Sequence, residues 1–483
     1  MVSILSAFIL AVAGATPQAN PIQGPTLRDA ILTENEGFLL LPAEVVCAPR
    51  VETAVWSPDG RYVLSVCTDD QMRPEFMEQV LSGKRPGPDV PPGFVSLNLW
   101  SAQTRRTKEI WKAPIAGTYV GTPAWLPGSD VALVSATLSS RDPISGEQRS
   151  RDVLFRMTAG TGHIEPVAEV RQDAAGRQYF MVSVSPNKPY AVLLRVQTFD
   201  SGMIEIESPR GATRMWQRRM GWLSVVRPAG APEGSVQVPI EFLSAYVLWQ
   251  EDGTPYVRCT TAPASPSEPT VARFFSFDVK TGALTQLQEE PKRFAAEAAD
   301  HPLRLRTLSV TTVLQGTSRA VTQLWLESPT QSEMQRALVC ADAGYDREQQ
   351  AGRLSPKVDG VLYLSQGAAF VKPLVRTSRE ALLEAARKTE ISRIVSNAKQ
   401  VAQALHIYTA DNDDTYPDPG EDIVGLLFPY LKMESAFEGF VYTFSGGPAR
   451  DIQNPSTTVM GYIPGPGGRA VMYADTHVRW IGN

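Results

Sequence analysis

A short strand–turn–strand unit recurs through the first 375 residues and constrains the fold of this chain more than any other feature. In its clearest copy, residues 54–66, two apolar stretches flank the turn Ser57-Pro58-Asp59-Gly60. Proline fixes φ at the first corner of such a turn, and Asp and Gly tolerate the conformations that follow. The unit therefore predicts an antiparallel β-hairpin.

Weaker copies of the unit follow at residues 123–134, 182–194, 247–257 and 354–364. The equivalent positions of the first four copies are separated by 69, 59 and 65 residues: Trp56, Trp125, Val184 and Trp249. Several copies precede a second hairpin, as at 274–287. Two hairpins make a four-stranded antiparallel sheet, the blade of a propeller. We therefore predict a mainly β fold, with a β-propeller of about six blades over residues 25–375. An array of β-sandwiches is the alternative.

The last repeat lacks a clear fourth strand. Residues 37–41, Gly-Phe-Leu-Leu-Leu, are apolar enough to supply it from the N-terminal side. Such a closure would cover a sheet edge that is otherwise prone to aggregation. The run from Trp56 to Arg61, Trp-Ser-Pro-Asp-Gly-Arg, also resembles the repeat of TolB-like propellers, which are common in bacterial envelope proteins. The resemblance implies a propeller, which does not by itself fix a function.

After Pro373 the pattern changes to helical spacing. Ser378 can cap a helix that spans roughly residues 378–410, and Pro417 prevents its continuation. One stripe of this helix is apolar. A compact apolar segment at Ile423–Leu431 and short strands near 441–444, 459–463 and 470–473 complete the pattern. Residues 376–483 are therefore expected to form a small α+β domain with one long helix.

This C-terminal domain resembles pilin-like (pseudopilin) proteins that carry a prepilin-processing-associated motif. The matching residues lie at 396–400, 404–408, 411–414, 416–417, 467–468, 474–475, 477–478 and 480. Two positions depart from the family: Thr476 follows Asp475 where Gly is usual, and Gly465 replaces a His. The N-terminal methylation motif is absent, so the resemblance implies a pilin head that does not polymerise as a pilin subunit.

Residues 1–15 predict a signal peptide, because a short apolar run ends in the small-residue pattern Ala13-Gly14-Ala15. The segment before this run has no Lys or Arg, so a buried N-terminal segment or an uncleaved anchor stays an alternative. No later segment predicts a stable membrane span, and we expect an extracytoplasmic location: periplasm, cell surface or secreted. Export would permit disulfides, and Cys47 and Cys67 are the best candidate pair.

Little in the sequence points to catalysis or metal binding. Asp411, Asp413 and Asp414 could supply oxygen ligands to calcium, although the EF-hand spacing fails and a solvated loop at the end of the helix is the favoured explanation. Asp475 and His477 stand two apart, which strand alternation alone explains. The sequence contains no Gly-x-Ser-x-Gly nucleophile elbow, no His-Glu-x-x-His zinc-binding motif and no glycine-rich phosphate-binding loop. Apart from calcium, we expect no cofactor.

The net charge of −5 argues against a nucleic-acid partner. The leading hypothesis is an exported, non-enzymatic binding or scaffold protein that holds a protein or peptide ligand at a propeller face. The pilin resemblance links it to a type II secretion or pilus-like system. A propeller enzyme, a hydrolase or lyase with its site in the central funnel, is the alternative, and a structural surface-layer component is a third. Acidic and histidine side chains converging in the funnel would favour the enzyme.

Overall fold

The structure, a computed structural model, describes residues 30–33, 36–48, 50–69, 93–115, 118–141, 148–172, 178–207, 213–262, 269–294, 303–314, 317–328 and 336–483. These residues divide into two compact units. The larger comprises the described residues of Leu40–Pro329 and Leu338–Val375. The smaller is built on Arg376–Asn483, together with residues 30–33, 36–39, 336 and 337.

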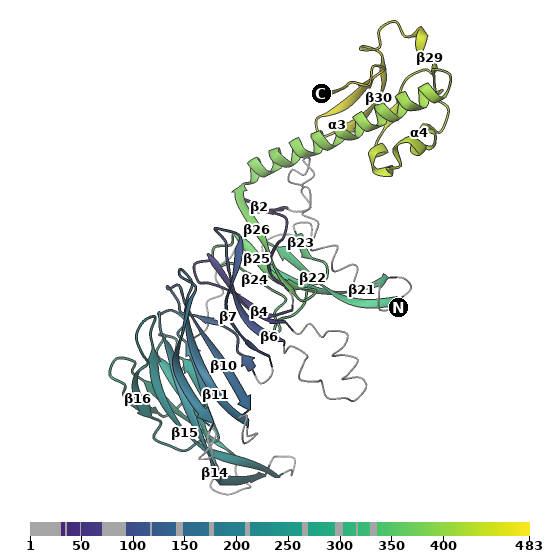
Figure 1. Cartoon of the computed structure of the whole chain (residues 1–483). Helices are drawn as coiled ribbons and strands as arrows, with labels where there is room; N and C mark the ends of the chain where they lie inside the picture. Colours follow the sequence, from purple (N-terminus) through teal and green to yellow (C-terminus); the bar gives the residue numbers. More distant parts are fainter. Residues whose placement is uncertain are drawn as a thin grey trace, which may run out of the picture. The chain divides into compact units, whose positions relative to one another are not determined.

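Among the described residues the larger unit contains six successive antiparallel sheets, drawn from purple through teal to green in Figure 1. Sheet 1 consists of β4 (Val51–Trp56), β5 (Tyr62–Asp69), β6 (Phe94–Ser101) and β7 (Arg106–Pro114). Sheet 2 consists of β8 (Thr118–Val120), β9 (Ala124–Trp125), β10 (Val131–Arg141), β11 (Gln148–Thr158) and β12 (His163–Gln172). Sheet 3 consists of β13 (Gln178–Val184), β14 (Ala191–Glu207), β15 (Thr213–Val226) and β16 (Glu233–Gln237).

The remaining three sheets follow the same order of strands. Sheet 4 consists of β17 (Ser244–Trp249), β18 (Pro255–Thr261), β19 (Val271–Phe277) and β20 (Leu284–Leu287). Sheet 5 consists of β21 (Arg304–Leu314), β22 (Thr317–Glu327) and β23 (Arg336–Cys340). Sheet 6 is built on β24 (Gly352–Leu354), β25 (Gly360–Ser365) and β26 (Ala368–Ser378), with β3 (Glu44–Cys47) paired to β26. Six such sheets make the predicted β-propeller.

The sheets pack through apolar cores at their shared faces. Separate buried clusters join sheet 6 to sheet 1, sheet 1 to sheet 2, sheet 2 to sheet 3, and sheet 3 to sheet 4. Strands β21 and β24 bring sheet 5 against sheet 6. The first strand of a sheet is its inner strand: β4 is mostly buried, whereas the last strands β7 and β16 are mostly exposed and β20 has no buried residue.

The recurrent turn explains the repeat pattern. The Ser57 hydroxyl donates to the Asp59 carboxylate at 2.7 Å and accepts from the Tyr62 backbone N–H at 2.9 Å. Gly60 follows with φ +70°, which glycine adopts without strain. The hydroxyls of Ser185 and Ser355 bind backbone N–H groups in the same way in sheets 3 and 6. The Ser-Pro sequence therefore marks a side chain that fixes the hairpin.

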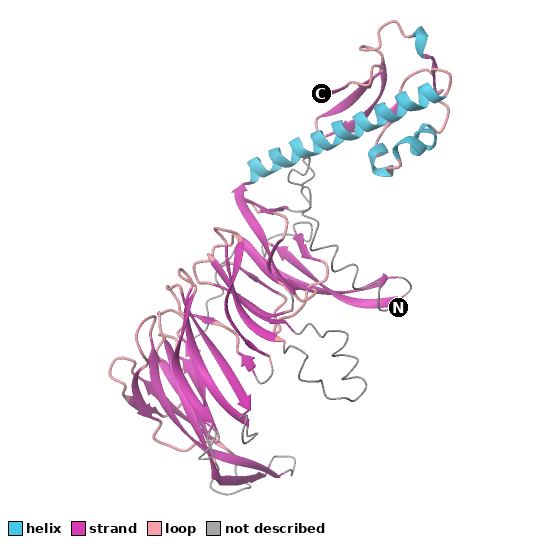
Figure 2. Cartoon of the chain, in the orientation of Figure 1, coloured by secondary structure: helices cyan, strands magenta, loops and turns pink. Residues whose placement is uncertain are grey.

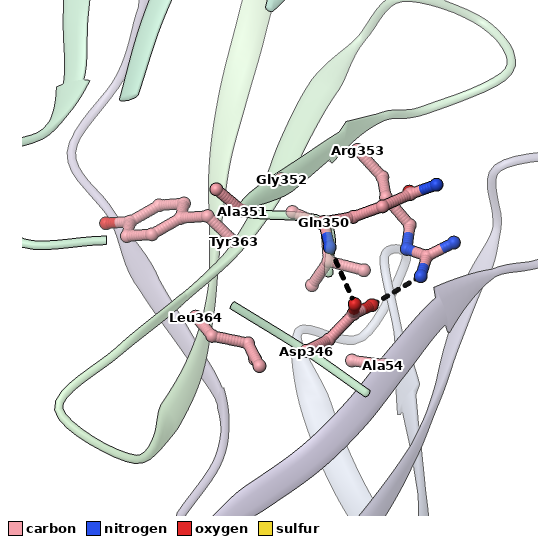
Figure 3. A pocket seen from close by; sticks show the side chains of 9 residues that line it. Ala54, Asp346, Gln350, Ala351, Gly352, Arg353, Tyr363 and Leu364 are labelled. Atoms are coloured by element: carbon pink, nitrogen blue, oxygen red, sulfur yellow. Dashed lines mark hydrogen bonds and ion pairs between the residues drawn. The ribbon is translucent and has the colours of Figure 1, made fainter. Parts of the chain in front are cut away.

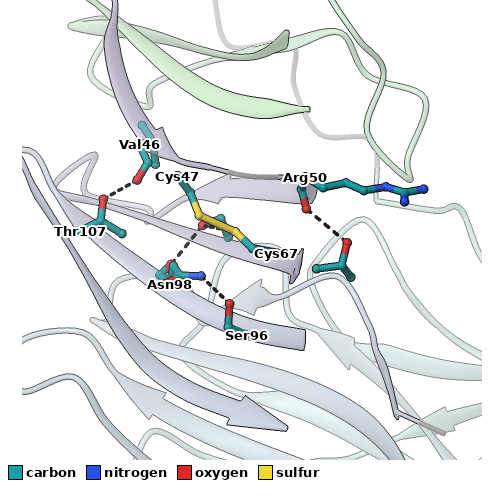
Figure 4. Close-up of a disulfide and its surroundings, with 9 residues drawn as sticks. Val46, Cys47, Arg50, Cys67, Ser96, Asn98 and Thr107 are labelled. Atoms are coloured by element: carbon teal, nitrogen blue, oxygen red, sulfur yellow. Dashed lines mark hydrogen bonds between the residues drawn. A yellow bond between two sulfur atoms is a disulfide. The ribbon is translucent and has the colours of Figure 1, made fainter. Parts of the chain in front are cut away.

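The N-terminal segment closes the propeller beside β26, as the sequence predicted. Strand β2 (Glu36–Leu40) pairs with β26, and β1 (Ala30–Leu32) pairs with β2. Strand β3 continues along β26, with Cys47 opposite Ala369. Figure 4 shows how β3 is also held to sheet 1: Cys47 forms a disulfide with Cys67 of β5, and Thr107 of β7 donates to the Val46 carbonyl. The closing strand thus binds the last blade to the first.

The smaller unit is built on one long helix, and Figure 2 shows the described helices in this part of the chain. Helix α3 runs over Arg379–Asp411, and the Ser378 hydroxyl accepts from the Ala381 N–H, which confirms the predicted cap. The helix packs on a sheet of order β28-β30-β31-β32 and on α4. The other elements are α4 (Ile423–Leu431), η2 (Glu434–Phe437), η3 (Ala449–Asp451), β27 (Thr415–Tyr416), β28 (Val441–Tyr442), β29 (Gly447–Pro448), β30 (Val459–Gly465), β31 (Gly468–Tyr473) and β32 (Val478–Gly482).

Gly465, the departure from the pilin-like pattern, has a structural reason. A Cβ atom at this position would lie 2.5 Å from Cδ1 of Ile394 and 2.8 Å from the ring of Trp480. Both side chains belong to or pack against the core of this unit. The space that a histidine side chain would need is therefore filled by Trp480. Within the described residues, no helix combines the length and the apolarity needed to cross a membrane.

Candidate functional site

The most distinctive polar and aromatic side chains of the propeller gather where its inner strands begin. Strands β4, β8, β13 and β17 each open a sheet, on its inner side. In a β-propeller the blades repeat one strand order around a common axis, so the beginnings of the inner strands lie on the same side of the propeller, which is called the mouth below. Two clusters of side chains occupy these beginnings.

The first cluster is organised by Arg347, in the connection between β23 and β24. Its guanidinium forms an ion pair with Glu52 of β4 and donates to the Val120 carbonyl of β8. The same guanidinium carbon lies 4.8 Å from the ring centroid of Tyr119, a cation–π distance. Arg347 therefore links sheets 1, 2 and 6, while Tyr119 keeps 58% of its surface exposed.

Asp346 fixes the connection that carries Arg347 (Figure 3). One carboxylate oxygen of Asp346 accepts the backbone N–H groups of Glu348 and Gln350, each at 2.9 Å, and the other pairs with Arg353. Asp346 is only 6% exposed. The adjoining cavity is about 10 Å³, about the space of one water molecule. Asp346 is thus fully engaged in shaping the loop, and this cavity is too small for a ligand.

The second cluster combines two tyrosines and an arginine from sheets 3 and 4. The guanidinium of Arg219 lies 6.0 Å from the ring centroid of Tyr179, near the start of β13, and donates to the Leu243 carbonyl at 2.6 Å. Tyr246 of β17 is 53% exposed. Burial raises the pKa of Tyr179, with the nearby Arg219 charge acting in the opposite direction. The Tyr179 phenol therefore stays neutral at physiological pH.

These clusters suit binding better than acid–base chemistry. The two carboxylates of the first cluster, Glu52 and Asp346, are each held in an ion pair with arginine. The histidines in the described chain lie elsewhere: His163 opens the outer strand β12, His406 is on α3, and His477 is in a C-terminal turn. Exposed tyrosine rings beside arginines offer apolar area and hydrogen-bonding tips, the combination enriched at protein-binding surfaces.

The predicted calcium residues lie at the end of α3. Asp411 is the last residue of the helix, and Asp413 and Asp414 follow with φ of 54° and 52°. The Asp414 carbonyl accepts the Ala449 N–H at 2.7 Å. In the described part of the chain, no three His, Cys, Asp or Glu side chains group closely enough to hold a metal ion. The calcium site therefore stays a prediction without a ligand cluster to support it.

Asp475 and His477 do meet, but within one turn. The Asp475 carboxylate contacts His477 Nδ1 at 2.5 Å and accepts its backbone N–H at 3.2 Å. The His477 ring stacks on Tyr473 with centroids 4.2 Å apart. Thr476, between them, has φ +70°, a conformation that favours glycine. These contacts close the turn before β32 and account for the pair without catalysis.

The sequence analysis did not single out Tyr119, Tyr179, Tyr246 or Arg347. The signal was available in the repeats, because the three tyrosines stand six, five and three residues before Trp125, Val184 and Trp249, respectively. Degenerate repeats of unequal spacing hid this recurrence. Arg347 follows no repeat, and its role depends on contacts with residues more than 200 positions away.

No family model matches the sequence, and no curated protein matches it. Several solved structures resemble it weakly. An oligogalacturonate lyase in complex with manganese is 12% identical and covers 75% of this chain and 79% of its own, with a TM-score of 0.27. The β-propeller domain of the Trilobed protease from Pyrococcus furiosus, described as having an open velcro topology, is 8% identical, covering 73% and 95%, with a TM-score of 0.27. The periplasmic gluconolactonase of Pseudomonas aeruginosa is 14% identical, covering 66% and 79%, with a TM-score of 0.25. At these TM-scores, the likenesses carry no argument about function.

Proposed function

We propose that this chain is an extracytoplasmic, non-enzymatic binding protein whose TolB-like propeller holds a protein or peptide segment at its tyrosine-lined mouth. The C-terminal unit would act as a pilin-like module that associates with a type II secretion or pilus-like apparatus. Calcium at Asp411, Asp413 and Asp414 would be an accessory ligand of that module.

One observation carries the binding proposal: Tyr119 and Tyr246 expose more than half of their surface although they stand on inner strands. Large aromatic side chains left open beside arginines are typical of residues that dominate binding energy at interfaces. Arg347 already lies against Tyr119, so the mouth is organised before a ligand arrives. A preorganised surface loses less entropy on binding.

Two observations support the location and the second unit. The Cys47–Cys67 disulfide fits an oxidising compartment, where such bonds persist. In the C-terminal unit a long helix packs along an antiparallel sheet, which is the arrangement that the resemblance to pilin-like proteins implies.

The test uses the full chain exported from a bacterial host and a displayed library of random peptides as the probe. We expect selected peptides to bind the wild-type protein and to lose at least about tenfold in affinity for the Tyr119→Ser/Tyr246→Ser variant, because each ring contributes more than 1 kcal/mol at a binding hot spot. Ile407→Ser, on α3, is the matched control, since Ile407 is also close to half-exposed. Equal affinity for all three proteins would refute the mouth as the binding site.

The enzyme alternative is tested with the same protein. A propeller hydrolase or lyase would turn over oligosaccharide, lactone or ester probes, and the Glu52→Gln variant would abolish that turnover. Turnover by the wild-type protein would overturn the non-enzymatic proposal.

A further inference from the structure

A second opening lies away from the mouth, between the outer part of sheet 3 and a turn of sheet 4. Its volume is about 260 Å³, enough for one or two amino-acid side chains. Three elements line it: the end of β15, the strand β16, and the segment from the end of β19 through the turn at 278–282. Its lining residues are Leu223, Val225, Glu233, Gly234, Ser235, Val236, Phe277, Val279, Lys280, Thr281 and Gly282.

Five apolar side chains lie among the polar groups that line this groove. Leu223, Val225 and Phe277 are buried and belong to the core between sheets 3 and 4, and Val236 and Val279 pack against that core. An apolar side chain placed in this groove would cover the half-buried Val236 and Val279 and remove their apolar surface from water.

One wall of the groove is a sheet edge. Strand β16 is the last strand of sheet 3 and, within the described residues, pairs only with β15. Four of its five residues are exposed. In an antiparallel pair, alternate residues direct their backbone N–H and C=O away from the partner strand. These groups form a template on which an extended peptide can be added as a further strand.

The register between β15 and β16 decides which residue of an added strand would direct its side chain into the groove. Val236 stands opposite Leu223, and both side chains line the groove. Residues directly opposite each other in a sheet point to the same face. A peptide residue paired with Val236 would therefore direct its side chain into the groove, while its neighbours would point away.

The charges at the rim favour an acidic neighbour. Glu233 is engaged by Arg227, with Nε and Oε2 2.7 Å apart, so this pair is neutral overall. Lys280 stands on the opposite rim with an exposed side chain. The turn below it is fixed by Asp278, which accepts the backbone N–H of Lys280 at 2.8 Å and whose carboxyl pKa is lowered by that hydrogen bond and, to a smaller extent, by the Lys280 charge. The exposed Lys280 ammonium group is a cation that the carboxylate of a ligand can reach.

We propose that this groove binds an extended peptide segment of another protein, added as a strand to β16, with one apolar anchor side chain in the groove and an acidic residue beside Lys280. The occupant is a peptide rather than a small molecule, because one wall of the groove is an open sheet edge. This proposal is independent of the mouth and concerns different residues.

The test uses fluorescein-labelled octathreonine peptides in which one threonine is replaced by a leucine anchor. A second threonine is replaced by glutamate, and the position of this glutamate is varied along the peptide. Fluorescence anisotropy measures the binding of each peptide to the full chain. We expect the best member to bind with a Kd below about 1 mM. Replacing its leucine by serine weakens binding about tenfold or more, because the anchor loses its apolar burial. N-methylation of amides that pair with β16 abolishes binding, whereas methylation of the intervening amides does not.

Substitutions in the chain test whether the peptides bind in this groove. Thr281→Trp fills the groove and is expected to abolish binding, while Thr161→Trp, in the equivalent Thr-Gly turn of sheet 2, leaves it unchanged. Both threonines are exposed, and each hydroxyl accepts a backbone N–H two residues ahead. Lys280→Glu reverses the preference, so that a peptide with lysine in place of glutamate binds better.

Three results would overturn the proposal. One is the absence of binding by every octapeptide at millimolar concentration. Another is equal binding to the wild-type protein and to Thr281→Trp. The third is concentration-dependent dimerisation in sedimentation velocity that Thr281→Trp abolishes, because a second copy of the chain would then be the occupant. Tyr119→Ser/Tyr246→Ser should leave octapeptide binding unchanged, so failure of the mouth proposal and failure of this one are distinguishable.

Discussion

Cys47 of the closing strand β3 is disulfide-bonded to Cys67 of β5, so a covalent bond joins the last blade of the propeller to the first. Cys67 pairs with Val51, which immediately precedes Glu52. The disulfide therefore also fixes the start of β4, where Glu52 meets Arg347. Closure of the ring and organisation of the mouth depend on the same short segment.

Removing this disulfide is expected to destabilise the propeller. Cys47→Ser/Cys67→Ser opens a link between residues 20 apart, and a loop of that length contributes about 3 kcal/mol in the chain-entropy description. Urea unfolding followed by tryptophan fluorescence measures the loss. Cys340→Ser, at a half-buried free thiol, is the control. A reductant should shift the wild-type midpoint by the same amount and leave the double variant unaffected; identical midpoints for all proteins would contradict the prediction.

Breaking the Arg347–Glu52 pair should loosen the contact of sheets 1, 2 and 6. Both side chains are about three-quarters buried. Arg347→Met removes the ion pair and the hydrogen bond to the Val120 carbonyl. We expect it to cost about 1–3 kcal/mol of unfolding free energy, because the Glu52 carboxylate and the Val120 carbonyl lose this partner. Glu52→Leu should cost a similar amount.

The double variant is the control for this pair. If the two residues act together, the cost of Arg347→Met/Glu52→Leu is smaller than the sum of the single costs, since neither charge is left alone. Chemical denaturation at neutral pH measures all three proteins. Simple additivity of the two costs would show that the ion pair contributes nothing.

The Arg156–Glu165 pair predicts a pH dependence. Hydrogen bonds and charge from Arg156 hold the pKa of the Glu165 carboxyl below its usual range. A carboxyl with a lowered folded-state pKa stabilises the fold above its unfolded-state value, and this stability is lost as pH falls through the folded-state pKa. The difference in melting temperature between the wild-type protein and Glu165→Gln should therefore be present at pH 7, begin to shrink near the usual glutamate pKa of about 4.3, and vanish once the pH is below the lowered folded-state pKa. Glu289→Gln, at an exposed carboxylate, provides the comparison; a difference that grows in acid would contradict the assignment.

The sequence predicted the elements whose causes are local. Ser378 and the apolar spacing behind it placed α3 within a residue at each end. The Ser-Pro-Asp-Gly turn placed β4 and β5, because Ser57 and Asp59 fix the hairpin by bonds within six residues. The closing strand followed from an unmatched edge, although β3 extends the pairing beyond the predicted residues.

The candidate site could not be predicted in the same way, because its contacts are not local. Arg347 reaches a carbonyl 227 positions away, and no spacing in the sequence indicates that partner. The groove beside β16 is formed by two blades. In the sequence its buried residues, such as Leu223 and Phe277, cannot be distinguished from other apolar core residues. Conversely, Asp411, Asp413 and Asp414 are adjacent in sequence, but backbone conformation rather than adjacency decides whether their oxygens converge.

Gly465→Ala is expected to destabilise the C-terminal unit through overpacking. The added Cβ would stand 2.5 Å from Cδ1 of Ile394 and 2.8 Å from the Trp480 ring. The isoleucine tip can turn aside, but the indole is too rigid to do so without displacing β32. We expect a loss of about 1–3 kcal/mol of unfolding free energy.

The comparison variant for Gly465 is Gly420→Ala, because a Cβ at Gly420 meets no atom within 4 Å and its φ is not positive. Thermal unfolding followed by far-UV circular dichroism reports the helix-containing unit. Gly465→Ala combined with Trp480→Leu should cost less than the sum of the two changes, since the smaller side chain makes room for the new methyl. A Gly465→Ala protein as stable as Gly420→Ala would show that Trp480 is not what requires glycine at this position.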